Sequence, residues 1–167
     1  MNNIDVNLAL KYFQNVVTQH YADFSGRVSR RDFWMFVLVY FVLALAVAIA
    51  GRILFLGMLM PLLQLVLLLP TSGLTARRLQ DTGKNGQIVW VFVVLSLVIN
   101  AVSLLAAMTF GAFGLVLLLL PLLGLLGIAN LVIAVYLIYL CAQPGTAGPN
   151  AYGPQPPVET AAPGVAT

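Results

Sequence analysis

The chain has 167 residues, of which 61% are apolar and 8% are charged. A soluble domain typically carries about a quarter charged residues, so this composition excludes an ordinary soluble globular protein and points to lipid as the solvent. The net charge is +3, and most basic residues lie beside apolar stretches, which favours membrane orientation and anionic lipid contacts over nucleic acid binding. The lone Cys141 and the lone His20 leave no disulfide and no metal site, so we expect no cofactor.

The N-terminal segment, residues 1–32, is the most polar part of the first half of the chain. Apolar and aromatic side chains recur in it at helical spacing, as at Tyr12 and Val16, which predicts a short amphipathic helix. We expect this helix to lie on the cytoplasmic membrane surface or to pack on the ends of the spans. Ser29, followed three residues later by Asp32, matches a capping box and predicts the start of the first long helix.

Residues 33–70 form an apolar stretch whose only charged residue is Arg52. About 20 residues cross the hydrocarbon core of a bilayer, so this stretch predicts two spans rather than one. We place these spans at about 33–50 and 53–70, with Gly51 and Arg52 at the hairpin between them.

The rest of the chain divides into a loop, two more spans and a tail. Residues 71–87 are polar and rich in turn residues, which predicts a cytoplasmic loop, and a third span follows at about 88–110. The stretch at about 113–140 is interrupted by Pro121, so it is either one kinked span, which we favour, or a broken or re-entrant segment. Residues 142–167 are rich in Pro, Gly and Ala and predict a flexible C-terminal tail that is disordered after about Pro154.

The expected fold class is therefore all-α: a polytopic membrane bundle of about four helices, within residues 33–141, preceded by an amphipathic helix. Seven of the eight basic residues lie in 1–32 and 71–87, two segments that flank an even number of crossings. The opposite side has only Arg52. The excess of cytoplasmic positive charge found in membrane proteins then predicts a multi-pass membrane protein with both termini in the cytoplasm.

Three motifs follow one another in the order of a known family pattern. They read F-S-G-R-x-x-R-x-x-F-W at 24–34, R-R-L-Q-D-T-G-K-N-G at 77–86 and G-T-x-G-P-N-x-Y-G-P at 145–154. In them the chain resembles the YhaH-like small bacterial inner-membrane proteins, a group filed as domain of unknown function 805. The resemblance implies a membrane location and no established activity. Gln80 stands where that family usually has His, so any proton or metal chemistry performed through that His would be missing here.

Charged residues of the two basic segments are expected to converge on one membrane face. One hypothesis is a site for anionic lipid head groups, a phosphorylated ligand or a partner, since arginine binds phosphate in a bidentate manner. The alternative is that these residues only set the topology. In either case we expect Asp81 or Asp32 to form ion pairs with arginines and so tie the N-terminal segment to the central loop. The candidate residues are Arg27, Arg30, Arg31, Arg77, Arg78, Asp81 and Lys84.

Three amide side chains, Gln64, Asn100 and Asn130, fall well inside the second, third and fourth expected spans. They could line a polar path, as intramembrane polar groups often do. The interpretation that we favour is hydrogen bonding between helices, which contributes about 0.6 kcal/mol per bond on average.

The sequence contains no common catalytic or nucleotide-binding motif, so we expect no enzyme. The leading hypothesis is a non-enzymatic interaction or structural module that binds membrane lipids and packs with itself or with a partner membrane protein. Small residues spaced four apart, as at Ala44 and Ala48, would allow such close helix packing. The alternative is a small transporter or channel component that uses the three amides.

Overall fold

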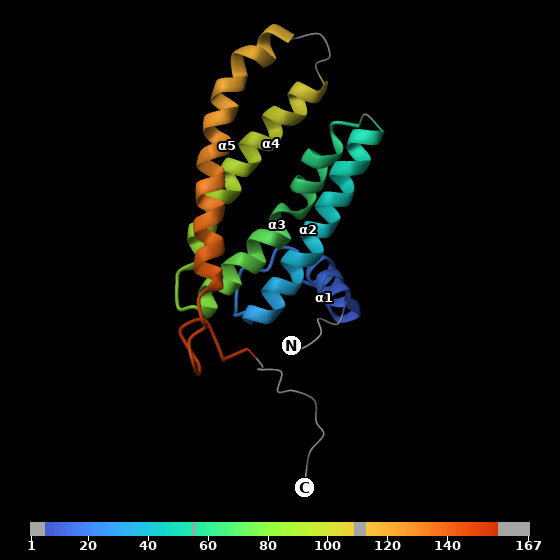
Figure 1. Cartoon of the computed structure of the whole chain (residues 1–167). Helices are drawn as coiled ribbons and strands as arrows, with labels where there is room; N and C mark the ends of the chain where they lie inside the picture. Colours follow the sequence, from blue (N-terminus) through green and yellow to red (C-terminus); the bar gives the residue numbers. More distant parts are fainter. Residues whose placement is uncertain (1–5, 55, 109–112, 157–167) are drawn as a thin grey trace.

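The computed structural model describes residues 6–54, 56–108 and 113–156, and within these ranges it is a bundle of helices (Figure 1). Four helical stretches are long and apolar enough to cross a membrane. The predicted fold class, a four-span bundle preceded by an N-terminal helix, is therefore confirmed. The elements are α1 (Val6–Gln19), α2 (Arg30–Ile53), α3 (Leu59–Asp81), the 3-10 turn η1 (Gly86–Ile88), α4 (Val89–Met108) and α5 (Phe113–Ala142).

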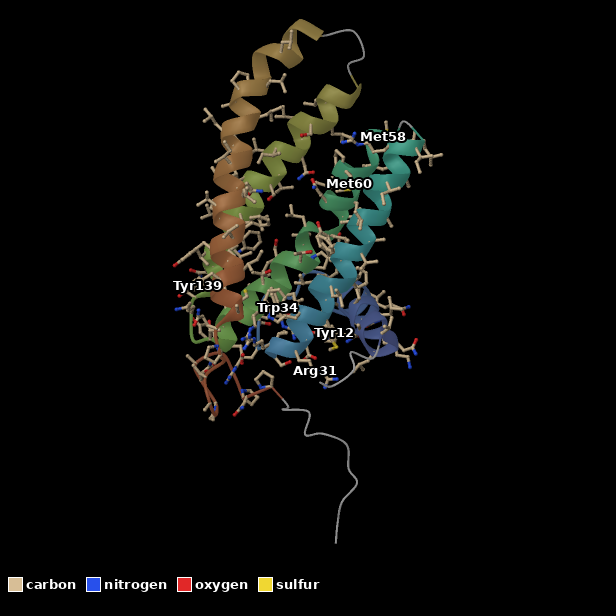
Figure 2. All side chains as sticks on the ribbon, in the orientation of Figure 1. Tyr12, Arg31, Trp34, Met58, Met60 and Tyr139 are labelled. Carbon is tan, nitrogen blue, oxygen red and sulfur yellow. The ribbon has the colours of Figure 1, made fainter. Side chains whose placement is uncertain are left out.

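The long helices form two antiparallel hairpins, α2 with α3 and α4 with α5, joined by packing of α3 on α4 (Figure 1). We call the end where α2 and α4 begin and α3 and α5 end the basic end. In Figure 2, Arg31 lies at this end and Met58 lies at the opposite end of the bundle. The helix α1 and the chain after α5 both lie at the basic end (Figure 1).

The helix α1 buries one face against α2, as its amphipathic pattern predicts. Ala9 and Val16 are buried, and the ring of Phe13 stacks on Phe36 of α2 with centroids 4.9 Å apart. Of the two expected positions, α1 therefore takes the one packed on the helix ends.

Ser29 caps the start of α2 as predicted, but the hairpin after α2 lies later than predicted. Ser29 Oγ accepts a hydrogen bond from the Asp32 N–H at 3.1 Å. At the other end, α2 continues through Gly51 and Arg52 to Ile53, so the placement of the turn at Gly51 and Arg52 was wrong. A Cβ atom on residue 51 would lie 3.3 Å from the Leu56 carbonyl oxygen, so the glycine allows the returning chain to pass close to the helix.

The helix α3 also extends further than predicted, because it continues through Pro70 to Asp81. Residues 71–81, expected to be loop, are helical. A proline lacks the N–H that would bond the carbonyl four residues earlier, which here belongs to Val66. The Tyr21 hydroxyl, from the chain after α1, donates to that Val66 carbonyl at 2.5 Å. A tertiary contact therefore supplies the hydrogen bond that the proline cannot make.

The end of α3 is set by Gly83, whose φ of 77° is accessible to glycine at little cost. The Gly83 N–H bonds the Gln80 carbonyl at 3.1 Å, and the Lys84 N–H bonds the Leu79 carbonyl at 3.0 Å. This pair of bonds is the Schellman motif, which satisfies carbonyls at a helix C-terminus.

Tyr21→Phe is expected to lower the free energy of unfolding by about 1 kcal/mol, the usual contribution of one hydrogen bond. In a Pro70→Ala background the Val66 carbonyl regains a helical donor, so the same substitution should cost clearly less. Reversible unfolding in mixed micelles of the four proteins of this double-mutant cycle measures the difference. Equal costs in the two backgrounds would contradict the assigned role of Tyr21.

The fourth apolar stretch is a single continuous helix, since α5 contains Pro121 without interruption. This observation agrees with one span and not with a broken segment. The helix of the third span, α4, begins at Val89, one residue after the predicted start, and runs to Met108; residues 109–112 lie outside the described chain.

The chain after α5 is not the flexible tail that its composition predicts. Residues 143–156, which we call the C-terminal strap, fold back on the basic end and make hydrogen bonds there (Figure 1). The flexible-tail prediction for residues 157–167 lies outside the described residues.

Candidate functional site at the basic end

A buried ion cluster holds the basic end together. Asp81, near the end of α3, accepts hydrogen bonds from Arg27 through Oδ1 at 2.9 Å and from Arg78 through Oδ2. The side chains of these three residues are at most 6% exposed. The expected ion pair between Asp81 and an arginine of the N-terminal segment is therefore confirmed, and it joins α3 to the chain before α2.

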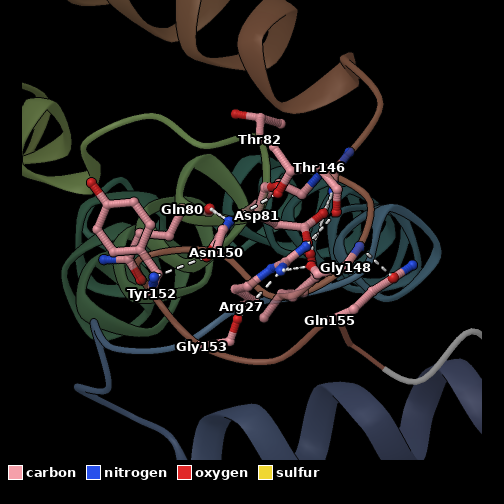
Figure 3. A network of polar contacts seen from close by, with 12 residues as sticks. Arg27, Gln80, Asp81, Thr82, Thr146, Gly148, Asn150, Tyr152, Gly153 and Gln155 are labelled. Atoms are coloured by element: carbon pink, nitrogen blue, oxygen red, sulfur yellow. Dashed lines mark hydrogen bonds and ion pairs between the residues drawn. The ribbon is translucent and has the colours of Figure 1, made fainter.

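Arg27 also holds the C-terminal strap (Figure 3). Its Nη1 donates to the Gly148 carbonyl at 2.6 Å and to the Gly153 carbonyl at 3.4 Å, and its Nη2 donates to the Thr146 carbonyl at 2.7 Å. One guanidinium thus binds the carboxylate of Asp81 and three backbone carbonyls of the strap.

Arg78 plays the same role toward the end of α5. Its Nε donates to the Cys141 carbonyl at 2.9 Å, and its Nη2 donates to the Gln143 carbonyl. Its Nη1 also reaches the Val28 carbonyl at 3.5 Å. Because Arg78 is fully buried, these carbonyls and Asp81 replace the water that a guanidinium otherwise binds.

Further bonds connect the strap directly to α3. The Thr146 N–H donates to the Asp81 carbonyl at 2.8 Å, and the Asn150 amide donates to the Gln80 carbonyl at 2.9 Å. The Gln80 amide in turn donates to the Phe24 carbonyl at 2.9 Å. Gln80 thus links all three motif segments.

An open cavity of about 490 Å³ lies beside the ion cluster. Arg30 and Arg31, at the start of α2, are exposed and line it together with the buried Arg27 and Arg78. Four arginines and two aspartates give its lining a formal net charge of +2. The lining residues are Arg27, Ser29, Arg30, Arg31, Asp32, Arg78, Asp81, Gly145, Thr146, Gln155 and Pro156.

Two of the predicted basic residues do not line this cavity. Arg77 faces Asp23, with Nη1 3.6 Å from the carboxylate, and Lys84 is exposed on the turn after α3. Burial opposes ionisation of Asp23, but hydrogen bonds from the Ser25 N–H and hydroxyl, together with the charge of Arg77, bring its pKa below the ordinary value. Of the seven predicted residues, the structure thus brings five together and places two apart.

Aromatic residues at the basic end mark where it would meet the lipid head groups. Trp34, Trp90, Tyr136 and Tyr139 are each at least 36% exposed, and they lie near the start of α2, the start of α4 and the end of α5. Trp34 and Tyr139 are visible near this end in Figure 2. Such aromatic belts occupy the membrane interface, so the arginine-lined cavity lies next to that level.

The three intramembrane amides line a second cavity, of about 290 Å³, between α2, α3, α4 and α5. Of Gln64, Asn100 and Asn130, the last bonds across helices, through Ser96. No cluster of three or more metal-ligating side chains occurs among the described residues.

Sequence reasoning missed the residues that hold the strap, chiefly Thr146 and Asn150. Their signal was present in the third motif, where Gly148 and Gly153 adopt φ of 73° and 134°. Motif glycines at such positions indicate a fixed turn rather than a flexible tail.

Comparison with known proteins agrees with this architecture. The family model described as protein of unknown function (DUF805) matches residues 21–154. The chain is 35% identical over 74 residues to the inner membrane protein YhaI of Escherichia coli, which covers 42% of the chain and 61% of that relative. It is 32% identical over 80 residues to the uncharacterized protein YiiR of the same organism, which covers 47% of the chain and 53% of that relative.

These matches span less than two thirds of the length of either curated relative. No solved structure matches the chain. The family model, however, covers most of the chain and includes all three motifs that meet at the ion cluster. The chain therefore belongs to the family described as protein of unknown function, DUF805.

Proposed function

We propose that this protein is a non-enzymatic inner-membrane module whose basic end binds the phosphate group of anionic phospholipids. The observation that carries the proposal is the arginine-lined cavity of about 490 Å³ beside lipid-facing aromatic residues. Its formal charge of +2 favours an anion. Its position near the aromatic belt favours a lipid head group over a solute from the bulk.

The arginines divide into two roles in this proposal. Arg27 and Arg78 already donate to Asp81 and to backbone carbonyls, so they supply positive potential and hold the wall of the cavity. Arg30 and Arg31 are exposed at the cavity and supply the contacts to phosphate. The start of α2 lies at the same place, and a helix N-terminus adds a partial positive charge.

The expected result is that Arg30→Gln/Arg31→Gln weakens binding of phosphatidylglycerol by about 10–30-fold, since each basic residue near a membrane surface contributes about 1 kcal/mol. Native mass spectrometry of the full-length protein titrated with this lipid measures the affinity. Both side chains are exposed, so the fold should be retained.

The matched control is Lys11→Gln/Lys84→Gln, which removes two exposed charges that do not line the cavity. An equal loss of lipid affinity in both double variants would show that net charge alone explains the effect. That result would contradict a specific binding site. A parallel titration with inorganic phosphate separates the two sources of the anion. Binding of phosphate but not of the lipid would overturn the assignment to a lipid head group.

The proposal includes an orientation, with the basic end in the cytoplasm, because the opposite end carries Arg52 as its one basic residue among those described. Lys84→Cys should then react with a membrane-impermeant maleimide only after the cells are permeabilised, whereas Gly57→Cys should react in intact cells. The native Cys141 is buried and should not interfere. The reverse labelling pattern would contradict the orientation.

A further inference from the structure

The second cavity, of about 290 Å³, lies between the helices of the bundle, is partly open at the exposed Gln64, and shares no lining residue with the cavity at the basic end. Helices α2, α3, α4 and α5 all contribute to it. Its polar lining residues are Tyr40, Gln64, Thr71, Ser96, Asn100 and Asn130.

Hydrogen bonding between helices accounts for only part of this polar lining. The Asn130 amide of α5 donates to Ser96 Oγ of α4 at 3.2 Å, which is the expected link between helices. The Asn100 amide instead donates at 2.8 Å to the Ser96 carbonyl, one turn earlier in its own helix. Asn100 therefore does not join two helices through this bond.

Thr71 is a lining residue whose buried polar group has no hydrogen-bond partner in the described part of the bundle. Its Oγ1 atom is buried and has no hydrogen-bond partner among the described residues. Gln64 lies seven residues before Thr71 on α3, so the two side chains share one face of the helix and line the same cavity. A buried hydroxyl without a partner costs about 1–3 kcal/mol. Thr71 as a whole is only half-buried, so rotation of its side chain would turn the hydroxyl toward the cavity, where a bound molecule with a suitable polar group would recover that cost.

The lining also defines the kind of molecule that fits. It contains no Asp, Glu, Lys, Arg or His, so a bound ion would lack a counter-charge. Its volume is close to the lower end of the range for small-molecule pockets, roughly 300 Å³. We propose that this cavity binds a small uncharged polar solute, with Thr71, Gln64 and Asn100 as its hydrogen-bonding partners. The proposal is independent of lipid binding at the basic end.

The test uses iodoacetamide, which is itself a small uncharged amide, on the full chain in lipid nanodiscs. Thr71→Cys should be alkylated at least about tenfold faster than Leu97→Cys. Leu97 is next to Ser96 on α4 but is 42% exposed and does not line the cavity. Mass spectrometry of the peptides separates both sites from the native Cys141.

Competition with unreactive acetamide distinguishes a cavity that binds a solute from a cavity that holds only water. Acetamide should slow alkylation of Thr71→Cys several-fold and leave that of Lys84→Cys, on the exposed turn, unchanged. Equal rates at positions 71 and 97, or fast alkylation at 71 that acetamide does not slow, would overturn the proposal. If Thr71→Cys does not fold, Gln64→Cys on the same helix face replaces it. The same comparison with Leu97→Cys and the same competition with acetamide then apply.

Discussion

Replacing Asp81 by alanine is expected to lower the free energy of unfolding by about 3–5 kcal/mol, the cost of removing one partner from a buried ion pair. The loss leaves the guanidinium groups of Arg27 and Arg78 buried next to each other without their shared carboxylate. Unfolding of the full chain in mixed micelles, followed by circular dichroism, measures the change.

Asp23→Ala is the matched control for this prediction. It removes the same group from a partly exposed ion pair with Arg77, which is worth at most about 1 kcal/mol, and from two exposed hydrogen bonds with Ser25 that water can replace. Similar losses for Asp23→Ala and Asp81→Ala would contradict the central position of Asp81. Replacing the whole ion cluster by apolar residues should not restore stability, because the strap and α5 carbonyls would lose their donors.

Gly145→Ala is the second substitution with a large expected effect. A Cβ atom at this position would clash with Asp81 Oδ2 and would lie 2.9 Å from its Cγ. Either the strap or the buried carboxylate must move, and overpacking of this kind costs about 1–3 kcal/mol. Limited proteolysis should then cleave the strap in the variant under conditions that leave the wild-type strap intact.

The control is Gly124→Ala in α5, where a Cβ would meet no atom within 4 Å. Alanine is also the better helix former, so this variant should be as stable as the wild type or slightly more stable. Destabilisation of both variants to the same extent would show that the close approach to Asp81 does not matter.

The spans could be predicted from the sequence because hydropathy and capping are local properties. The start of α2 was confirmed at the Ser29 and Asp32 box, and the expected ion pair of Asp81 was confirmed as well. Errors arose where a distant residue overrides a local signal. Pro70 suggests a helix end, but Tyr21, 45 residues away from Val66, supplies the missing donor.

The strap could not be predicted from composition for a related reason. Its Pro, Gly and Ala residues offer little apolar surface to bury, which normally indicates disorder. It is held instead by its own backbone carbonyls at Thr146, Gly148 and Gly153, and these accept from a single arginine more than 100 residues earlier in the chain. Backbone acceptors exist at every position, so a sequence does not reveal which of them an arginine will select.

The same limit applies to the cavity at the basic end. Charge counting grouped seven residues on one face, yet packing decides which of them lie exposed at the cavity. Arg27 and Arg78 are committed to the fold, whereas Arg30 and Arg31 are exposed at the cavity. The distinction follows from burial, which depends on how the ends of α3 and α5 and the strap pack around Arg27 and Arg78.

The most direct measurement is the proximity of lipid phosphorus to arginine in the intact protein. Solid-state NMR with carbon–phosphorus dipolar dephasing, on arginine-labelled protein in phosphatidylglycerol bilayers, detects this contact. We predict dephasing of guanidinium carbons in the wild type and in Lys11→Gln/Lys84→Gln, with most of it lost in Arg30→Gln/Arg31→Gln. Undiminished dephasing in that last variant, or none in the wild type, would contradict a phosphate site at the basic end.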